Sequence, residues 1–127
     1  MPRSTLGRSA LRQRLAAFPL ATEEEPFGPG VWVYKVCGRV FALLTQEGEP
    51  PRLSLKCDPA RALELRAAFA TVTPGYHLNK EHWNTLALDG SLPPALVEDL
   101  VDHSFQRVAA GLRRAERQAL AIHGSTT

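Results

Sequence analysis

The chain begins with a segment in which apolar and polar residues follow a helical period. Four apolar side chains fall on one stripe of such a helix: Leu6, Leu11, Leu15 and Phe18. Ser4 can cap the first turn, because a serine hydroxyl accepts a hydrogen bond from a free backbone N–H. The pattern therefore predicts a helix from residue 4 to about residue 18, ended by Pro19 and followed by a Pro/Gly-rich loop over residues 21–30.

The next two segments, VWVYKV and RVFALL, are rich in β-branched and aromatic residues and are separated by a Cys-Gly pair. This pattern predicts a tight β-hairpin. A two-residue turn would align two pairs on one side of the hairpin: Tyr34 with Phe41, and Trp32 with Leu43. Both sides of the hairpin are then largely apolar. One side must lie under helices, and the other must be covered by something else or be exposed.

The segment RLSLKC alternates, which predicts a strand with three residues inward (Leu53, Leu55, Cys57) and three outward (Arg52, Ser54, Lys56). Asp58 and Pro59 then predict the N-cap and first residue of a helix that ends near residue 69. Two extended segments follow, over residues 71–76 and in HWNTLALD. Apolar residues keep helical spacing from residue 91 to about residue 120, which predicts one long final helix.

The predicted order of elements is therefore α-β-β-β-α-β-β-α. Strands that arrive in runs between helices are typical of an α+β fold, here a two-layer sandwich of an antiparallel sheet with helices on one face. The length of 127 residues and the apolar content of 44% suit a single domain over residues 1–127 with a real core. Residues 121–127 are expected to fray.

Composition narrows the class of protein further. The apolar runs are far shorter than the roughly 20 residues that a membrane helix needs, and the N-terminus has no secretory apolar core. A cytoplasmic protein without membrane contact is therefore expected. Cys37 and Cys57 are too few for a disulfide framework and too far apart for a CxxC site, so two reduced thiols are expected.

The chain lacks the usual sequence signatures of catalysis. It contains no phosphate-binding loop, no dinucleotide fingerprint and no nucleophile elbow. Asp102, His103 and Ser104 are adjacent, but neighbours on a helix point in different directions, which argues against a triad. Zinc ligands usually come in close pairs, and this signature is absent too. The sequence therefore predicts a protein that is not an enzyme, with no catalytic residues, metal or cofactor.

Several blocks of the sequence resemble one known family. The strings YKVCGRVFALL, LSLKCDP, PGYHLNKEHWNTLALDGSLP and LVDHSFQRV are together similar to the MmcQ/YjbR family of bacterial proteins, in order from about residue 18 to residue 112. This chain departs from the family at Cys37, Arg39 and Phe105, where glycine, lysine and tyrosine are frequent. The resemblance implies an α+β domain like the secretion-chaperone or CyaY-like sandwiches. It also implies DNA binding through a double-wing arrangement of hairpins.

DNA binding would use basic residues on the predicted strands and turns as phosphate contacts: Lys35, Arg39, Arg52, Lys56 and Lys80. Three further side chains could approach sugars or base edges: His77, Asn79 and Trp83. Five neutralised phosphates would give a slope of log K against log salt of about −4 to −5. The net charge of +2 is low for a dedicated DNA-binding domain, although both ends of the chain are basic.

Two other functions remain open from the residues alone. The first is a protein- or peptide-binding or homodimerising module that uses the hairpin face of Trp32, Tyr34, Phe41 and Leu43. The second is a small-ligand pocket around residues 76–83, where donors, acceptors and aromatic rings are concentrated. In that segment, His77 and Asn79 could instead satisfy backbone groups of a turn.

Overall fold

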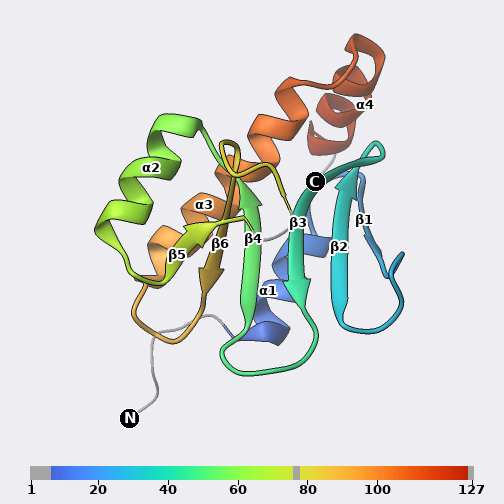
Figure 1. The fold of residues 1–127 in the computed structure, drawn as a ribbon. Helices are drawn as coiled ribbons and strands as arrows, with labels where there is room; N and C mark the ends of the chain where they lie inside the picture. The colour runs from blue at the N-terminus through green and yellow to red at the C-terminus, as the bar shows by residue number, and fades with distance from the viewer. Residues whose placement is uncertain (1–6, 76–77, 126–127) are drawn as a thin grey trace.

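A six-stranded antiparallel sheet organises the computed structural model of the chain, which describes residues 7–75 and 78–125 (Figure 1). The strands lie side by side in the order β1-β2-β3-β4-β6-β5. Their bounds are β1 Ala21–Glu24, β2 Val31–Val36, β3 Arg39–Thr45, β4 Arg52–Lys56, β5 Val72–Pro74 and β6 Trp83–Ala87. The fold is α+β, as the order of runs in the sequence predicts.

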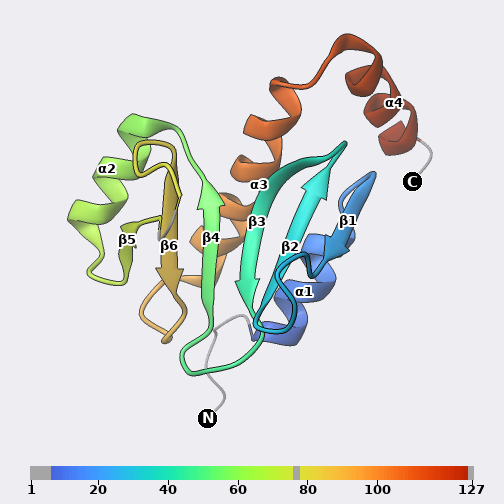
Figure 2. The same ribbon diagram turned by 45° about the vertical axis from the view of Figure 1, so that its right-hand side comes forward.

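Helices cover one face of this sheet. Their bounds are α1 Arg8–Ala16, α2 Pro59–Ala68, α3 Pro94–Ala110 and α4 Arg114–Ser125. Figures 1 and 2 show α1 and α3 behind the sheet, α2 beside β5 and β6, and α4 beyond one end of the strands. Leu11 and Leu15 of α1 are buried, as the helical stripe predicts. We call the opposite side of the sheet the open face.

The beginnings of the helices confirm one predicted cap and contradict another. Asp58 caps α2, since its Oδ2 accepts a hydrogen bond from the Arg61 backbone N–H at 3.1 Å, and Pro59 opens the helix. The first helix begins at Arg8 after Gly7, with no side-chain cap. The predicted cap at Ser4 is therefore wrong, because Gly7 occupies the N-cap position; Ser4 itself lies outside the described residues.

Strand β1 lies in the segment that the sequence indicated was a loop, so that prediction was wrong. Its alanine and its two glutamates have weak strand propensity, and its position depends on contacts with distant residues. Glu23 pairs with Tyr34 in β2, and its carboxylate accepts hydrogen bonds from the Tyr34 hydroxyl at 2.6 Å and from Arg12 at 2.9 Å. The contact with Arg12 lowers the pKa of Glu23, and burial raises that of Tyr34.

The final helix is broken, whereas the sequence predicted one continuous helix. Helix α3 ends at Ala110 and is followed by Gly111, a residue that weakens helices because its backbone is so free. A new helix begins at Arg114, where Glu116 reaches back to accept the Arg113 backbone N–H at 3.0 Å. This bond is half of a capping box. The apolar residues keep helical spacing across the break, so the sequence pattern did not reveal the break. The chain also stays helical to Ser125, beyond the predicted end.

The β2–β3 hairpin is confirmed, but its predicted register is wrong. Cys37 and Gly38 both have positive φ, as a two-residue primed turn requires. Beyond Lys35 and Val40 the register shifts by one, so that Tyr34 pairs with Ala42 rather than with Phe41. Phe41 is the extra residue of a β-bulge, which re-aims a side chain and strengthens the local twist.

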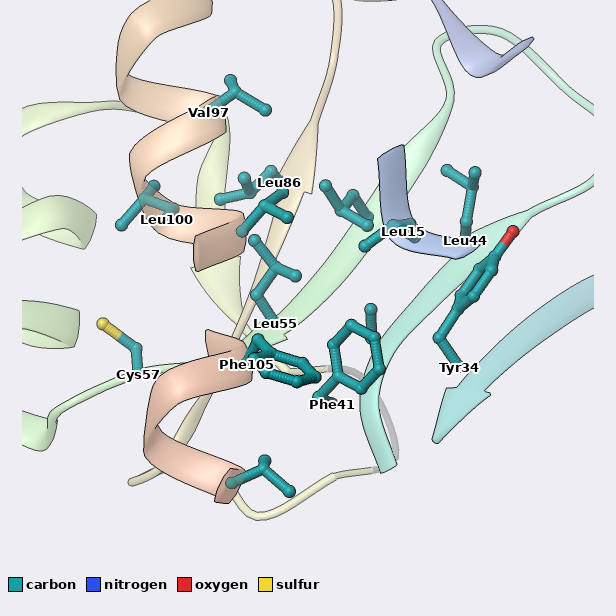
Figure 3. Packing of buried hydrophobic residues seen from close by; sticks show 14 of the residues in the cluster. Leu15, Tyr34, Phe41, Leu44, Leu55, Cys57, Leu86, Val97, Leu100 and Phe105 are labelled. Atoms are coloured by element: carbon teal, nitrogen blue, oxygen red, sulfur yellow. The ribbon is translucent and has the colours of Figure 1, made fainter. Parts of the chain in front are cut away.

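The bulge places Phe41 at the centre of an aromatic cluster in the core. Its ring lies 5.5 Å from that of Phe18 and 5.1 Å from that of Phe105 between centroids, in edge-to-face geometry with both. Phe18 and Phe105 stack at 4.4 Å. Figure 3 shows Phe105 of α3 directed toward Phe41, with Tyr34 further along the sheet. Helix α3 is thereby fixed to the centre of the sheet.

Two properties of the chain bear on its environment. Among residues 7–75 and 78–125, no helix is long and apolar enough to cross a membrane. Both cysteines are free, as predicted; Cys57 is buried, and burial raises the pKa of its thiol. The cytoplasmic location stays a prediction.

Candidate functional site

Strand β4 contributes polar side chains to the open face, and its predicted alternation of inward and outward residues is confirmed. Leu53 and Leu55 are buried under the helices, so Arg52, Ser54 and Lys56 point away from them. Ser54 lies in a row of paired residues that crosses five strands: Val33, Leu43, Ser54, Thr85 and Thr73. The Ser54 and Thr85 hydroxyls are 2.8 Å apart and hydrogen-bonded. Five strands thus bring short or apolar side chains to the middle of this face.

This face contains a groove of about 500 Å³. Its apolar lining comes from four residues: Phe27, Val31, Leu43 and Leu78. Its polar lining comes from Thr45, Arg52, Ser54 and Thr85. Phe27 stands in the β1–β2 loop with 79% of its surface exposed, an unusual position for a large aromatic ring. The groove is concave and mostly apolar, which is typical of a ligand-binding site.

Three cations at or near this face have no carboxylate partner within ion-pair distance in the described part of the chain: Arg52, Lys56 and Lys80. Arg52 and Lys56 lie on either side of Ser54 along β4, about 13 Å apart by the rise of a strand. Lys80 is exposed in the β5–β6 loop, which also supplies Leu78 to the groove. These positive charges are therefore available to an outside anion.

The other predicted phosphate contacts lie in different surroundings. Lys35 is on the open face, but its Nζ is 3.1 Å from Glu24 Oε1. The Arg39 guanidinium lies beside Gly111 at the α3–α4 junction, near Glu116, and so belongs to the helix side. His77 lies outside the described residues. The five predicted basic contacts therefore do not form one continuous surface.

In the PGYHLNKEHW segment, the glycine and the asparagine stabilise the backbone of the turn itself. Gly75 donates its N–H to the Trp83 carbonyl at 2.8 Å, and a Cβ on Gly75 would lie 2.7 Å from the Trp83 Cβ. Only glycine permits that approach. Asn79 Oδ1 accepts the backbone N–H groups of Glu81 and His82 at 2.9 and 3.2 Å. The alternative prediction for Asn79, a residue that satisfies a turn, is thus confirmed.

An arginine of α2 holds this loop in place. Arg66 donates to Asn84 Oδ1 at 2.7 Å and to the carbonyl oxygens of Lys80 and Trp83. Asn84 is itself buried and donates to the Ala62 carbonyl at 3.3 Å. The Trp83 side chain alternates with Asn84, so it lies on the open face, where it pairs with Lys56. A half-buried indole and an unpaired ammonium group therefore lie side by side.

The predicted hairpin patch for a protein partner is divided by the structure. Tyr34 and Phe41 are fully buried in the core, whereas the bulge turns Leu43 to the opposite face. Trp32 packs at the edge of the core, with the Arg12 guanidinium 4.3 Å from its ring centroid. Leu43 alone lines the groove on the open face. These four residues do not share an exposed surface, while a protein partner or a homodimer stays a prediction.

The adjacent residues Asp102, His103 and Ser104 each bind a different element. Asp102 accepts hydrogen bonds from Arg14 of α1 at 3.0 and 3.1 Å. His103 Nε2 accepts the Asp58 backbone N–H at 3.1 Å. The buried Ser104 hydroxyl donates to the Phe41 carbonyl at 2.6 Å and accepts the Lys56 N–H at 2.8 Å. The direct pairing of β3 with β4 stops at Ala42 and Leu55, and the Ser104 hydroxyl bridges the next two residues, Phe41 and Lys56.

The surroundings of His103 favour its neutral form. Burial lowers the pKa of its imidazole, and the guanidinium groups of Arg61 and Arg107 lower it further. The hydrogen bond from Asp58 requires an unprotonated Nε2, which agrees with this direction. Within the described residues, no three histidine, cysteine or acidic side chains are grouped so as to hold a metal ion.

We expect the free energy of unfolding to decrease as the pH falls below 6.5, the ordinary pKa of histidine. The unfolded chain takes up a proton on His103 before the folded chain does, so the stabilisation is complete above that pH and is lost toward the lowered pKa. Urea denaturation at several pH values should show this slope. In His103→Gln, which retains an acceptor but does not titrate, the slope should be smaller. Equal slopes in both proteins would contradict the assignment.

The groove was hardly predictable from the sequence. Phe27, Val31 and Thr45 were not among the predicted site residues, and Leu43 was assigned to a different surface. The one available signal was Phe27, an aromatic residue within a Pro/Gly-rich stretch. Groove residues come from the β1–β2 and β5–β6 loops and from four strands, so only the sheet order brings them together.

The molecule is thus an open-faced α+β sandwich with a hollowed face that carries unpaired cations. The YjbR family model matches residues 16–107, and the chain belongs to the YjbR family. The protein named YjbR of Escherichia coli K12 is 41% identical over 86 residues, which cover 68% of this chain and 73% of that protein. The Escherichia coli O157:H7 protein named YbdF is 33% identical over 93 residues, covering 73% of this chain and 76% of YbdF.

Solved structures agree with this assignment. The crystal structure of the Deinococcus radiodurans protein DR2400 superposes with a TM-score of 0.87 at 38% identity, covering 95% of this chain and 92% of that one. A Pseudomonas syringae crystal structure gives a TM-score of 0.69 at 25% identity, covering 80% of this chain and 97% of that one. The break between α3 and α4 lies past residue 107, outside the match to the family model.

Proposed function

We propose that this protein is a non-enzymatic DNA-binding protein that contacts duplex phosphates from the open face of its sheet. The observation that carries the proposal is the lack of carboxylate partners for Arg52, Lys56 and Lys80 among the described residues. Six other arginines are each within 4 Å of an acid: Arg8, Arg12, Arg14, Arg61, Arg107 and Arg113. Four further arginines also lack a carboxylate within this distance among the described residues, but they belong to other parts of the molecule: Arg39 on the helix side, Arg66 of α2, and Arg114 and Arg117 of α4.

Unpaired cations are the ones that can contribute binding free energy to DNA. A lysine that neutralises a phosphate releases condensed counterions, whereas Lys35 must first give up its contact with Glu24. The roles of Asp102, His103 and Ser104 within the fold also support a function other than catalysis. Trp83 lies next to Lys56 and offers a flat apolar surface for a sugar. Three contacts predict a slope of log K against log salt of about −3.

Two lysine variants test this proposal. Lys56→Ala and Lys80→Ala should each weaken binding of a labelled duplex and reduce the salt slope by about one, because each removes one phosphate contact. Fluorescence anisotropy from about 50 to 200 mM salt measures both quantities. Arg39→Ala is the matched control, since Arg39 lies on the helix side and its loss should leave the slope unchanged.

Two outcomes would contradict DNA binding by this face. The first is an absence of duplex binding at about 50 mM salt with protein in the tens of micromolar, where nonspecific binding is strong. The second is an effect of Arg39→Ala equal to that of Lys56→Ala, which would indicate diffuse attraction to the whole molecule. Circular dichroism of each variant confirms that the fold is retained.

A further inference from the structure

The groove on the open face has an apolar lining that plays no part in phosphate binding. Val31 and Leu43 come from paired strands, and Leu78 and Phe27 approach from two loops. These four side chains would gain free energy by contact with an apolar body. A volume of about 500 Å³ lies within the range of small-molecule sites. The exposure of Phe27 is then explained by a role in covering a bound molecule.

One charged group lines this groove, and it is a cation. Arg52 has no carboxylate partner among the described residues, and none of the eight lining residues is acidic. The Arg52 backbone N–H is bound to Thr45 Oγ1 at 2.9 Å, which fixes the start of β4 beneath its side chain. A guanidinium presents two parallel N–H donors, a geometry that matches a carboxylate.

We propose that the groove binds an amphipathic carboxylate, with its apolar chain over Leu43 and Val31 and its carboxylate on the Arg52 guanidinium. The hydroxyls of Ser54 and Thr85 are hydrogen-bonded to each other, so they present little unsatisfied polarity to an apolar chain. The groove therefore has an apolar floor and a cationic end. This inference goes beyond DNA binding, because it depends on Phe27 and Leu43, which contact no phosphate in that proposal.

Decanoate is a suitable probe, used below its micelle-forming concentration with isotope-labelled full-length protein. We expect saturable binding with a Kd below about 1 mM, and amide NMR shifts concentrated at the groove residues. Decanol, which has the same chain without the charge, should bind at least about tenfold more weakly, because the charge-assisted hydrogen bonds are lost. Arg52→Gln should weaken decanoate binding by a similar factor.

Two further variants separate the groove from its surroundings. Phe27→Ala changes an exposed side chain and should weaken decanoate binding about fivefold while the fold is retained. Lys80→Ala should leave decanoate binding unchanged although it weakens DNA binding, so the two proposals can fail independently.

Three results would overturn the inference. The first is an absence of binding at about 1 mM decanoate. The second is equal binding of decanol and decanoate with no effect of Arg52→Gln, which would mean a nonspecific apolar surface. The third is a dimer in light scattering that Leu43→Gln dissociates, since a second copy of the chain would then occupy the groove.

Discussion

Replacing Phe41 with alanine is expected to lower the free energy of unfolding by about 3–5 kcal/mol. Phe41 is fully buried, and its ring has edge-to-face contacts with Phe18 and Phe105, which hold α3 against the sheet. Alanine would remove these contacts and leave a cavity. The bulge fixes the backbone at this position, so neighbouring side chains can fill the space only in part.

Phe27→Ala is the matched control, because it removes the same ring from a position with 79% exposure. Its effect should stay within about 0.5 kcal/mol, as for most surface substitutions. Urea denaturation followed by tryptophan fluorescence measures both variants. A loss below about 1 kcal/mol for Phe41→Ala would contradict its place at the centre of the core.

Ser104→Ala is expected to lower the free energy of unfolding by about 2–4 kcal/mol, a large effect for the loss of one oxygen atom. The variant leaves the Lys56 N–H without its acceptor and the Phe41 carbonyl without its donor. Each unsatisfied buried group costs about 1–3 kcal/mol. Water cannot easily replace the hydroxyl, because Ser104 is fully buried.

Ser54→Ala is a fair comparison, since it removes a hydroxyl that bonds to Thr85 on the open face. Its cost should be about 1 kcal/mol, close to the net value of an ordinary hydrogen bond. Equal losses for the two serine variants would mean that β3 and β4 can close the gap without Ser104. Hydrogen exchange of the Lys56 amide gives an independent reading, because that amide should lose protection only in Ser104→Ala.

Elements with strong local signals were predicted correctly from the sequence. The β2–β3 hairpin, the alternation of β4 and the capped start of α2 depend on neighbours within a few residues. The resemblance to the YjbR family gave the fold over most of the chain, and the family match agrees with it. Ser104 was also detectable in principle, because it occupies the apolar stripe of α3 between Leu100 and Val108.

The remaining features depend on contacts between distant residues. Strand β1 is held in place by hydrogen bonds from Tyr34 and Arg12 to the Glu23 carboxylate, and no local sequence pattern indicates these bonds. The bulge at Phe41 exchanges the predicted faces of Ala42 and Leu43, so that Ala42 is buried and Leu43 lines the groove, because a single shift of register changes every later partner. The groove and its unpaired cations follow from sheet order and from the ion pairs that other arginines form, neither of which is visible along the chain.

The two outer strands of the sheet have a consequence for self-association. β5 is three residues long and ends in Pro74, which has no N–H to offer a neighbouring chain. At the opposite border, β1 is four residues long and carries two glutamates, whose charges would repel the same strand of another copy. Filament growth by strand addition is therefore disfavoured at both borders, and the protein can expose a sheet surface in a crowded cell without polymerising.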